Sequence, residues 1–163
     1  GRIEMKVLIV SDTHGKDENL EETVLRETPF DYFIHCGDVE GREIFMEALV
    51  ECPCTIVSGN NDFFSDLPRE VMIQLEGHRI LVTHGHYYGV SMGLYGVLDE
   101  GKARECQVVL FGHTHRPVEE TEEGILLLNP GSLSYPRQEG RRPSYAVMEL
   151  QQGKAPVAEI RYL

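Results

Sequence analysis

Five short apolar segments each lead into an aspartate, asparagine or histidine, and this pattern constrains the fold more than any other feature. The first segment, residues 7–10, leads into Asp12 and His14. The other four are residues 34–36, 55–58, 80–83 and 108–111, each with a glycine close to the polar residue. Continuous apolar runs predict buried, mainly parallel strands. Because ligands bind at the carboxyl ends of such strands, the polar residues predict one common site.

The segments between and after these strands predict the rest of the fold. Apolar residues at helical spacing occupy three segments, residues 17–28, 43–50 and 94–105. Further strands are predicted in hairpins and in a C-terminal pair, residues 71–83, 117–128 and 144–162. Alternation of strands and helices in the first part of the chain predicts parallel, right-handed connections. We therefore expect an α/β fold, a four-layer α-β-β-α sandwich with two mixed sheets packed face to face and helices outside.

Length and charge limit the class of protein. The 163 residues suffice for one domain with a buried core. Residues 1–4 precede Met5 and are predicted to be a cloning remnant, followed by a single domain at 5–163. The net charge of −12 argues against broad nucleic-acid binding through a basic surface. No apolar run approaches membrane-spanning length, so we expect no membrane partner and a cytoplasmic location.

The polar residues at the strand ends form a set of ligands suited to transition metals. They comprise two carboxylates, one amide and four imidazoles: Asp12, His14, Asp38, Asn60, His84, His113 and His115. Mixed nitrogen and oxygen ligands favour Mn²⁺, Fe, Zn²⁺, Co²⁺ or Ni²⁺, and the lack of thiolate argues against a structural zinc site. The set is too large for one four-coordinate ion but suits two ions that share a carboxylate. Two ions roughly 3.5–4 Å apart favour an in-line phosphoryl displacement.

These residues also occur in an ordered series of motifs. The series is Asp12-Thr13-His14, Gly37-Asp38, Gly59-Asn60-Asn61-Asp62, Thr83-His84-Gly85-His86, Gly112-His113-Thr114-His115 and Asn129-Pro130-Gly131-Ser132. It resembles the calcineurin-like metallophosphoesterase superfamily, in particular its small YfcE-type phosphodiesterases. The resemblance implies a two-metal enzyme, with Mn²⁺ favoured, that hydrolyses a small phosphodiester by attack of a metal-bound hydroxide.

The resemblance further implies a role for each ligand. One metal would be held by Asp12, His14, Asp38 and His115, and the other by Asp38, Asn60, His84 and His113, so that Asp38 bridges them. Asp62 would be a hydrogen-bond partner behind the ligands. Asn61 stands where many members have a histidine, which leaves open what protonates the leaving group.

Four residues are expected to contact the substrate: Asn61, His86, Ser132 and Arg137. His86 follows His84 by two positions and could face the same site. For Ser132 and Arg137 the alternative is a plain turn after a strand. Among the other histidines, His35 is predicted to be a hydrogen-bonded core residue and His78 an exposed turn residue.

Two alternative functions remain open. A phosphomonoesterase would use the same metals and further cationic groups, for which Arg137, Arg141 and Arg142 are the candidates. A non-catalytic interaction scaffold of the same fold would depart from the ligand pattern, whereas here the set is complete.

Overall fold

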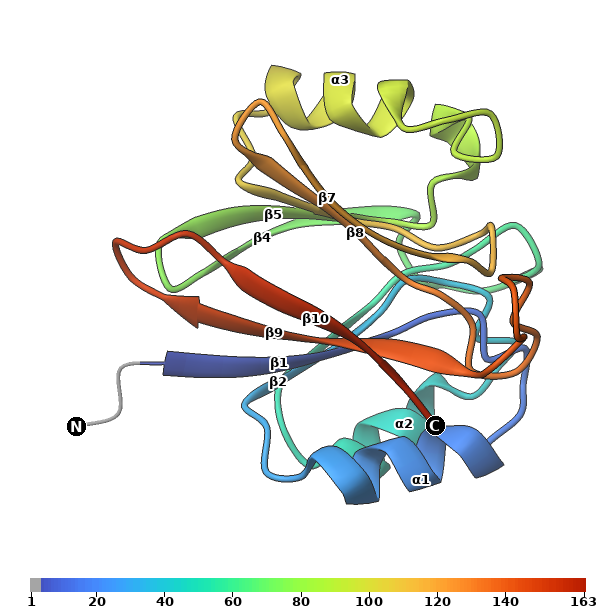
Figure 1. Cartoon of the computed structure of the whole chain (residues 1–163). Coiled ribbons are helices and arrows are strands. Elements are labelled where there is room, and N and C mark those ends of the chain that lie inside the picture. Colours follow the sequence, from blue (N-terminus) through green and yellow to red (C-terminus); the bar gives the residue numbers. More distant parts are fainter. Residues whose placement is uncertain (1–3) are drawn as a thin grey trace.

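The computed structural model describes residues 4–163, in which two five-stranded sheets pack face to face (Figure 1). The first sheet contains, in spatial order, β10 (Val157–Tyr162), β9 (Ser144–Gln151), β1 (Glu4–Val10), β2 (Tyr32–His35) and β3 (Cys54–Ile56). The second contains β4 (Glu70–Leu75), β5 (His78–Thr83), β6 (Val108–Leu110), β8 (Ile125–Pro130) and β7 (Pro117–Glu122). Of the predicted cloning remnant, residues 1–3 lie outside the described residues and Glu4 begins β1.

Helices cover the outer face of each sheet. Helices α1 (Glu18–Glu27) and α2 (Glu43–Val50) lie beneath the first sheet, and α3 (Tyr95–Ala103) lies above the second (Figure 1). This arrangement confirms the predicted four-layer α-β-β-α sandwich. None of the helices in residues 4–163 has the length and apolar character needed to span a membrane.

The burial of β1 on both faces explains its continuous apolar sequence. Val7 and Ile9 pack in the core between the two sheets, whereas Leu8 and Val10 pack in the core between the first sheet and the helices α1 and α2. Side chains of a strand alternate between faces, so a strand covered on both sides must be apolar at every position. Each such side chain stabilises the fold by roughly 1.5–3 kcal/mol relative to exposure.

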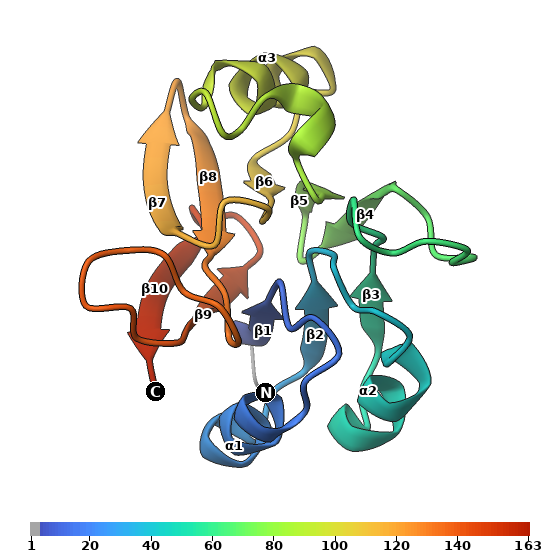
Figure 2. The same ribbon diagram turned by 90° about the vertical axis from the view of Figure 1, so that its right-hand side faces the viewer.

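Three neighbouring strands in each sheet run parallel, and this places the ends of six strands at one edge of the sandwich. In the first sheet they are β1, β2 and β3; in the second they are β5, β6 and β8. The loops that follow these strands gather at the right of Figure 1 and face the viewer in Figure 2. The polar residues predicted at the strand ends lie in these loops.

The structure differs from the sequence predictions in a few places. The glycine-rich residues 85–93 predict a loop, and a short 3₁₀ helix, η1 (His86–Tyr88), occupies part of it. The Asn129–Ser132 motif is typical of a turn after a strand, but strand β8 continues through Asn129 and Pro130. The predicted exposure of His78 is wrong: its side chain is buried beneath the C-terminal hairpin, and Nε2 lies 2.7 Å from the backbone oxygen of Lys154.

Candidate metal centre

Five of the seven predicted ligands have a left-handed backbone, which is unusual for residues other than glycine. Their φ angles lie between 49° and 73°, and they are Asp12, His14, Asp38, His113 and His115. Such conformations persist only where the surrounding structure enforces them, and they cluster at functional sites. Here the amide of Asp12 donates to Gly37 O at 3.0 Å and that of His14 to Asp38 O at 2.9 Å. The loops after β1 and β2 therefore hold each other in place.

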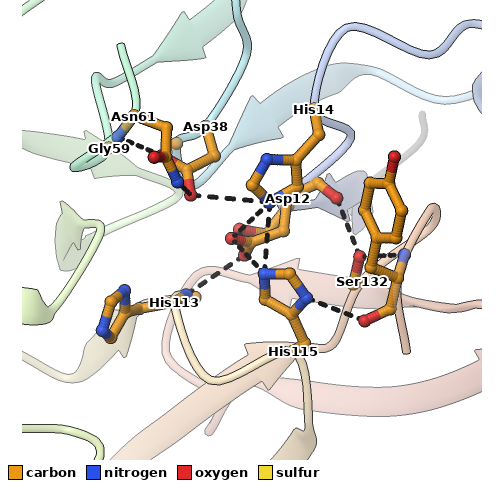
Figure 3. A network of polar contacts seen from close by, with 12 residues as sticks. Asp12, His14, Asp38, Gly59, Asn61, His113, His115 and Ser132 are labelled. Atoms are coloured by element: carbon orange, nitrogen blue, oxygen red, sulfur yellow. Dashed lines mark hydrogen bonds and ion pairs between the residues drawn. The ribbon is translucent and has the colours of Figure 1, made fainter. Parts of the chain in front are cut away.

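The first group of side chains contains Asp12, His14, Asp38 and His115, each of which offers a ligand atom within 4.8 Å of the others (Figure 3). Nε2 of His115 lies 3.2 Å from Asp12 Oδ1 and 3.2 Å from His14 Nε2. Nε2 of His14 lies 3.6 Å from Asp38 Oδ2. These atoms come from three different loops, and the structure brings them together at one point.

The second group contains Asp38, Asn60, His84 and His113. Oδ1 of Asn60 lies 3.0 Å from His84 Nε2 and 3.1 Å from His113 Nδ1. Nε2 of His84 lies 3.4 Å from Asp38 Oδ2. The same oxygen of Asp38 therefore faces both groups, as a shared ligand must.

Hydrogen bonds behind three histidines fix which ring nitrogen faces the site. Nδ1 of His84 lies 2.7 Å from Cys36 O, Nδ1 of His115 lies 2.7 Å from Tyr135 O, and Nδ1 of His14 lies 3.2 Å from Glu40 Oε1. Because these oxygens only accept hydrogen bonds, Nδ1 carries the proton in each ring. Nε2 therefore faces the carboxylates, and it is the nitrogen whose lone pair becomes available to a metal ion when its proton is lost.

The electrostatics of the cluster favour charged carboxylates. Burial opposes the charged form of Asp12, yet the imidazoles of His115 and His14 hold its pKa well below the usual range. Burial likewise opposes the charged form of Asp38, and His84 nevertheless keeps its pKa low. In turn, the Asp12 carboxylate raises the pKa of His14 to about 9. The cluster thus attracts positive charge.

A divalent cation fits this arrangement. Oδ2 of Asp12 accepts hydrogen bonds from the Ser11 hydroxyl at 2.6 Å and from the His113 amide at 3.1 Å. Oδ1 of the same carboxylate is buried and accepts no hydrogen bond from residues 4–163. It lies close to Nε2 of His14 and His115, at 3.7 and 3.2 Å. In the metal-free protein a proton on Nε2 of His14 offsets the charge of this oxygen, as the raised pKa of His14 shows, and a divalent cation can take the place of that proton. Nitrogen and oxygen donors without thiolate suit borderline divalent ions.

Asp62 and Asn61 lie behind the ligands and position Asp38. The Asp62 carboxylate accepts four backbone amides, from Gly59 at 2.7 Å, Asp38 at 2.8 Å, Val39 at 3.1 Å and Glu40 at 2.6 Å. It therefore joins the loop after β2 to the loop after β3. Asn61 donates its backbone amide to Asp38 Oδ1 at 2.9 Å and its side-chain amide to Oδ2 at 3.0 Å.

Two glycines allow the loops to approach this closely. A Cβ at Gly59 would overlap the Asp38 carboxylate, and a Cβ at Gly112 would overlap the Ser11 hydroxyl and lie 2.7 Å from Asp12 Oδ2. Both positions adjoin a predicted ligand. The glycines beside the polar residues in the sequence are thus explained by close packing of one loop against another.

The other predicted substrate contacts occupy different places. His86 is half-buried beside the rings of His84 and His113, at 5.4 and 5.8 Å between centroids, and lines a cavity of about 370 Å³. Ser132 is fully buried, and its hydroxyl donates to the backbone oxygen of Asp12 at 2.8 Å, so it lies behind the site. Arg137 is exposed and lines a second cavity next to His14 and His115.

Sequence reasoning missed three residues that contact the ligands or their loops. Glu40 contacts Nδ1 of His14, and Tyr135 accepts from His115 through its backbone oxygen. Asn129 donates to Gly112 O at 3.1 Å and accepts from Gly131 N at 2.8 Å. Only Asn129 had a sequence signal, because it belongs to the Asn129–Ser132 motif. Glu40 and Tyr135 lie in irregular loops, where no periodic pattern marks them.

His35 is a buried hydrogen-bonded residue, as predicted: Nε2 lies 2.9 Å from Thr13 Oγ1.

The chain belongs to the calcineurin-like phosphoesterase superfamily, whose domain matches residues 5–153. It is 38% identical over 156 residues to a probable metallophosphoesterase of Bacillus subtilis, covering 94% of this chain and 89% of that protein. A phosphodiesterase of Methanocaldococcus jannaschii is 27% identical over 150 residues, covering 78% of this chain and 83% of that protein. A crystal structure of a predicted phosphoesterase from Streptococcus pneumoniae has a TM-score of 0.80 at 28% identity, covering 99% of this chain and 100% of that chain.

These findings confirm the resemblance seen in the motifs. Membership of the family implies a phosphoester hydrolase that binds divalent metal ions, and the cluster at the strand ends is the candidate site for them.

Proposed function

We propose that the protein is a phosphodiesterase that binds two divalent metal ions and hydrolyses a small phosphodiester. The ions would be held as the motifs suggest, with Asp38 shared between the two groups of ligands. Mn²⁺ is the favoured metal, and Ni²⁺, Fe, Zn²⁺ and Co²⁺ suit the same donors. Two such ions supply the charge that activates water and stabilises the phosphoryl group.

The observation that carries this proposal is the convergence of imidazole nitrogens on the Asp12 and Asp38 carboxylates. Three imidazoles, those of His14, His84 and His115, are oriented from behind so that Nε2 faces these oxygens. This is what a metal site requires, because a hydrogen-bond acceptor behind each ring keeps a proton on Nδ1 and makes Nε2 the nitrogen that exchanges its proton for a metal ion.

The ligand set also explains how an acidic protein would bind an anionic substrate. The chain has a net charge of −12, but the predicted ligands include only two carboxylates. Four neutral imidazoles and one amide add no charge. Two divalent ions therefore leave the occupied site positive, and a phosphodiester anion is attracted to it.

A phosphodiester is favoured over a monoester because the archaeal relative described above is named a phosphodiesterase. The side chain of Asn61 is hydrogen-bonded to Asp38 and cannot deliver a proton at neutral pH, so we expect the enzyme to favour diesters with acidic leaving groups. The scaffold alternative takes second place because the ligand set is complete.

Reconstitution with metal tests the proposal. Metal-free protein is loaded with each candidate ion, the bound ions are counted by elemental analysis, and hydrolysis of bis(p-nitrophenyl) phosphate is compared with that of p-nitrophenyl phosphate. We expect two ions per chain and a preference for the diester.

A matched pair of variants controls for folding. Asp12→Asn should lose bound metal and activity, whereas Asp17→Asn, which only weakens the contact of Asp17 with Arg42, should retain both. Fewer than two ions in the wild type, or hydrolysis that does not depend on metal, would overturn the proposal. A preference for the monoester would favour the phosphomonoesterase alternative.

A further inference from the structure

A cavity of about 500 Å³ adjoins the candidate metal centre on the side of His14 and His115. Arg137 and Arg141 line it together with Tyr135. The cavity beside His86 differs in composition: its lining includes Phe63, Phe64 and Tyr87, and its arginine, Arg69, lies over the Tyr87 ring at 4.8 Å. The cavity next to His14 therefore has two arginines in its lining, whereas the arginine of the other cavity is stacked on an aromatic ring.

Neither of the two arginines is neutralised by a carboxylate of the described residues. The chain has 27 acidic and 15 basic residues, and some of its arginines are paired with carboxylates, as in Arg42–Asp17, Arg104–Glu70 and Arg161–Glu27, whereas others, such as Arg69 and Arg79, are not paired in the part of the chain that the structure describes. Within residues 4–163, the side chains of Arg137 and Arg141 have neither an ion pair nor a hydrogen bond. Free guanidinium groups in an acidic protein, at the wall of a cavity, indicate a site for an anion.

The carboxylate that shares this cavity is engaged elsewhere. Glu40 lines the same cavity, but its Oε1 lies 3.2 Å from Nδ1 of His14. It therefore orients a predicted metal ligand and leaves the guanidinium groups unpaired.

The backbone attaches Arg137 directly to the metal centre. Its amide donates to His115 O at 3.0 Å, and Tyr135 O accepts from the ring of the same histidine at 2.7 Å. The hydroxyl of Ser134 donates to Thr13 O at 2.6 Å. The loop that carries the arginine is thus joined to the loops after β1 and β6, and its position relative to the metal site is set by these bonds.

A turn returns the chain so that Arg141 reaches the same cavity. Its amide donates to Gln138 O at 3.0 Å, and Gly140 within the turn has a φ angle of 84°. Arg141 itself has a φ angle of 45°. A left-handed arginine costs conformational energy, and such a conformation persists where the surrounding structure enforces it.

Lys16 adds a third positive charge beside the cavity. Its Nζ lies 4.5 Å from the centre of the Tyr135 ring, and the same ring packs edge-on against His14 at 5.4 Å. Tyr135 therefore forms a wall between the predicted ligand and the lysine. Three cationic side chains, those of Arg137, Arg141 and Lys16, therefore lie at or beside this cavity, against one carboxylate in its lining, that of Glu40.

We propose that the cavity binds a second phosphate group of the substrate, so that the preferred substrate is a phosphodiester that carries a phosphate on one of its ester groups. Arg137 and Arg141 would hold this phosphate while the scissile phosphorus lies at the metal centre. Two guanidinium forks offer more donors than one carboxylate can accept, whereas a phosphate has three acceptor oxygens and up to two negative charges. This inference rests on the proposed function and names its substrate class.

A matched pair of substrates tests the inference. Thymidine 5′-(p-nitrophenyl phosphate) and its 3′-phosphorylated derivative have the same scissile diester and the same leaving group, and they differ only in the second phosphate. Release of p-nitrophenol gives kcat/KM for each, and the ratio of the two values is the measured quantity. We expect the wild type to prefer the phosphorylated substrate by roughly 10–100-fold.

Three variants locate the source of that preference. In Arg137→Gln and Arg141→Gln the ratio of the two kcat/KM values should fall by about tenfold, because each variant loses a charge-assisted hydrogen bond to the second phosphate. Arg142→Gln is the matched control, because Arg142 lies on the same loop but points to Leu163 O and the Tyr162 ring. It should leave the ratio unchanged. Both substrates are assayed on one preparation, so any loss of folded protein cancels in the ratio.

The possible results separate the inference from the proposed function. A wild-type ratio near one, or a ratio that survives both substitutions, would overturn the inference. Equal losses on both substrates would show that the arginines act on the scissile phosphate, which also overturns it. If neither substrate is hydrolysed with any metal, the proposed function has failed. Calorimetric binding of thymidine 3′,5′-bisphosphate against thymidine 5′-monophosphate then still decides whether the cavity recognises a second phosphate.

Discussion

Replacement of Asp62 by asparagine should release two of the loops that carry the predicted ligands. The Asp62 carboxylate accepts amides from Gly59, Asp38, Val39 and Glu40. Three of these donate to Oδ2 and the fourth to Oδ1. An asparagine of the same shape can keep one acceptor oxygen, but its amide nitrogen must then face one of the backbone N–H groups, donor against donor.

The expected loss of stability follows from these bonds. Hydrogen bonds to a charged group contribute about 1.5–3 kcal/mol each, against about 1 kcal/mol for neutral pairs. The variant weakens the bonds at the retained oxygen and leaves one amide unpaired. Since Asp62 is half-buried, solvent offsets part of this loss, and we expect a decrease in the free energy of unfolding of about 2–3 kcal/mol.

Urea unfolding of the metal-free protein measures this quantity, and a titration with Mn²⁺ followed by elemental analysis measures the effect on metal binding. Asp66→Asn is the matched control, because Asp66 is an exposed aspartate a few residues away. Asp62→Asn should be less stable than this control and should bind metal more weakly. If the two variants unfold at the same urea concentration and bind metal equally, the argument that Asp62 joins the two loops is refuted.

Three further predictions concern the site and the core. Asp38→Ala should lower metal content and kcat/KM more than His14→Ala under the same metal supply, because Asp38 Oδ2 faces both ligand groups; equal, modest losses would show that it is not shared. Asn61→His should flatten the dependence of log(kcat/KM) on leaving-group pKa for a series of diesters, because an imidazole can deliver a proton worth roughly 10²–10⁴-fold in rate; parallel slopes in wild type and variant would contradict this. Burial lowers the pKa of His35 from 6.5 to about 4, so between these values the unfolded chain binds a proton that the folded chain does not. The contribution of His35 to the free energy of unfolding should therefore fall by roughly 2 kcal/mol from pH 7 to pH 5, and His35→Gln should lack this part of the slope in urea unfolding; identical slopes would count against it.

Most of the fold was predictable because its signals are local. The apolar run at residues 7–10 predicts a strand covered on both faces, and the helices and hairpins follow from spacing and turn residues in the same way. His78 shows where local reasoning fails. It follows the turn residue Gly77, which suggests exposure, but the hairpin of β9 and β10, some 75 residues later, covers it and supplies Lys154 O as a partner.

In the candidate site, too, some features could be predicted from the sequence and others could not. The types of ligand and their order were readable from residues such as Asp12 and His115, because each stands directly after an apolar run. Their convergence was not, since these two residues lie on different sheets and meet only because the parallel strands of both sheets end at one edge.

Finer features of the site depend on contacts between distant segments and have no sequence signature of their own. Nε2 of His84 faces the carboxylates because Cys36 O accepts from its other nitrogen, and Asp38 is held by Asn61 and Asp62 from the loop after β3. The pairing of Arg137 with Arg141 at one cavity depends on a turn and on a backbone bond to His115. Chemistry at a single residue can be recognised from its type and neighbours, but distances between residues far apart in the chain are set by sheet register and packing.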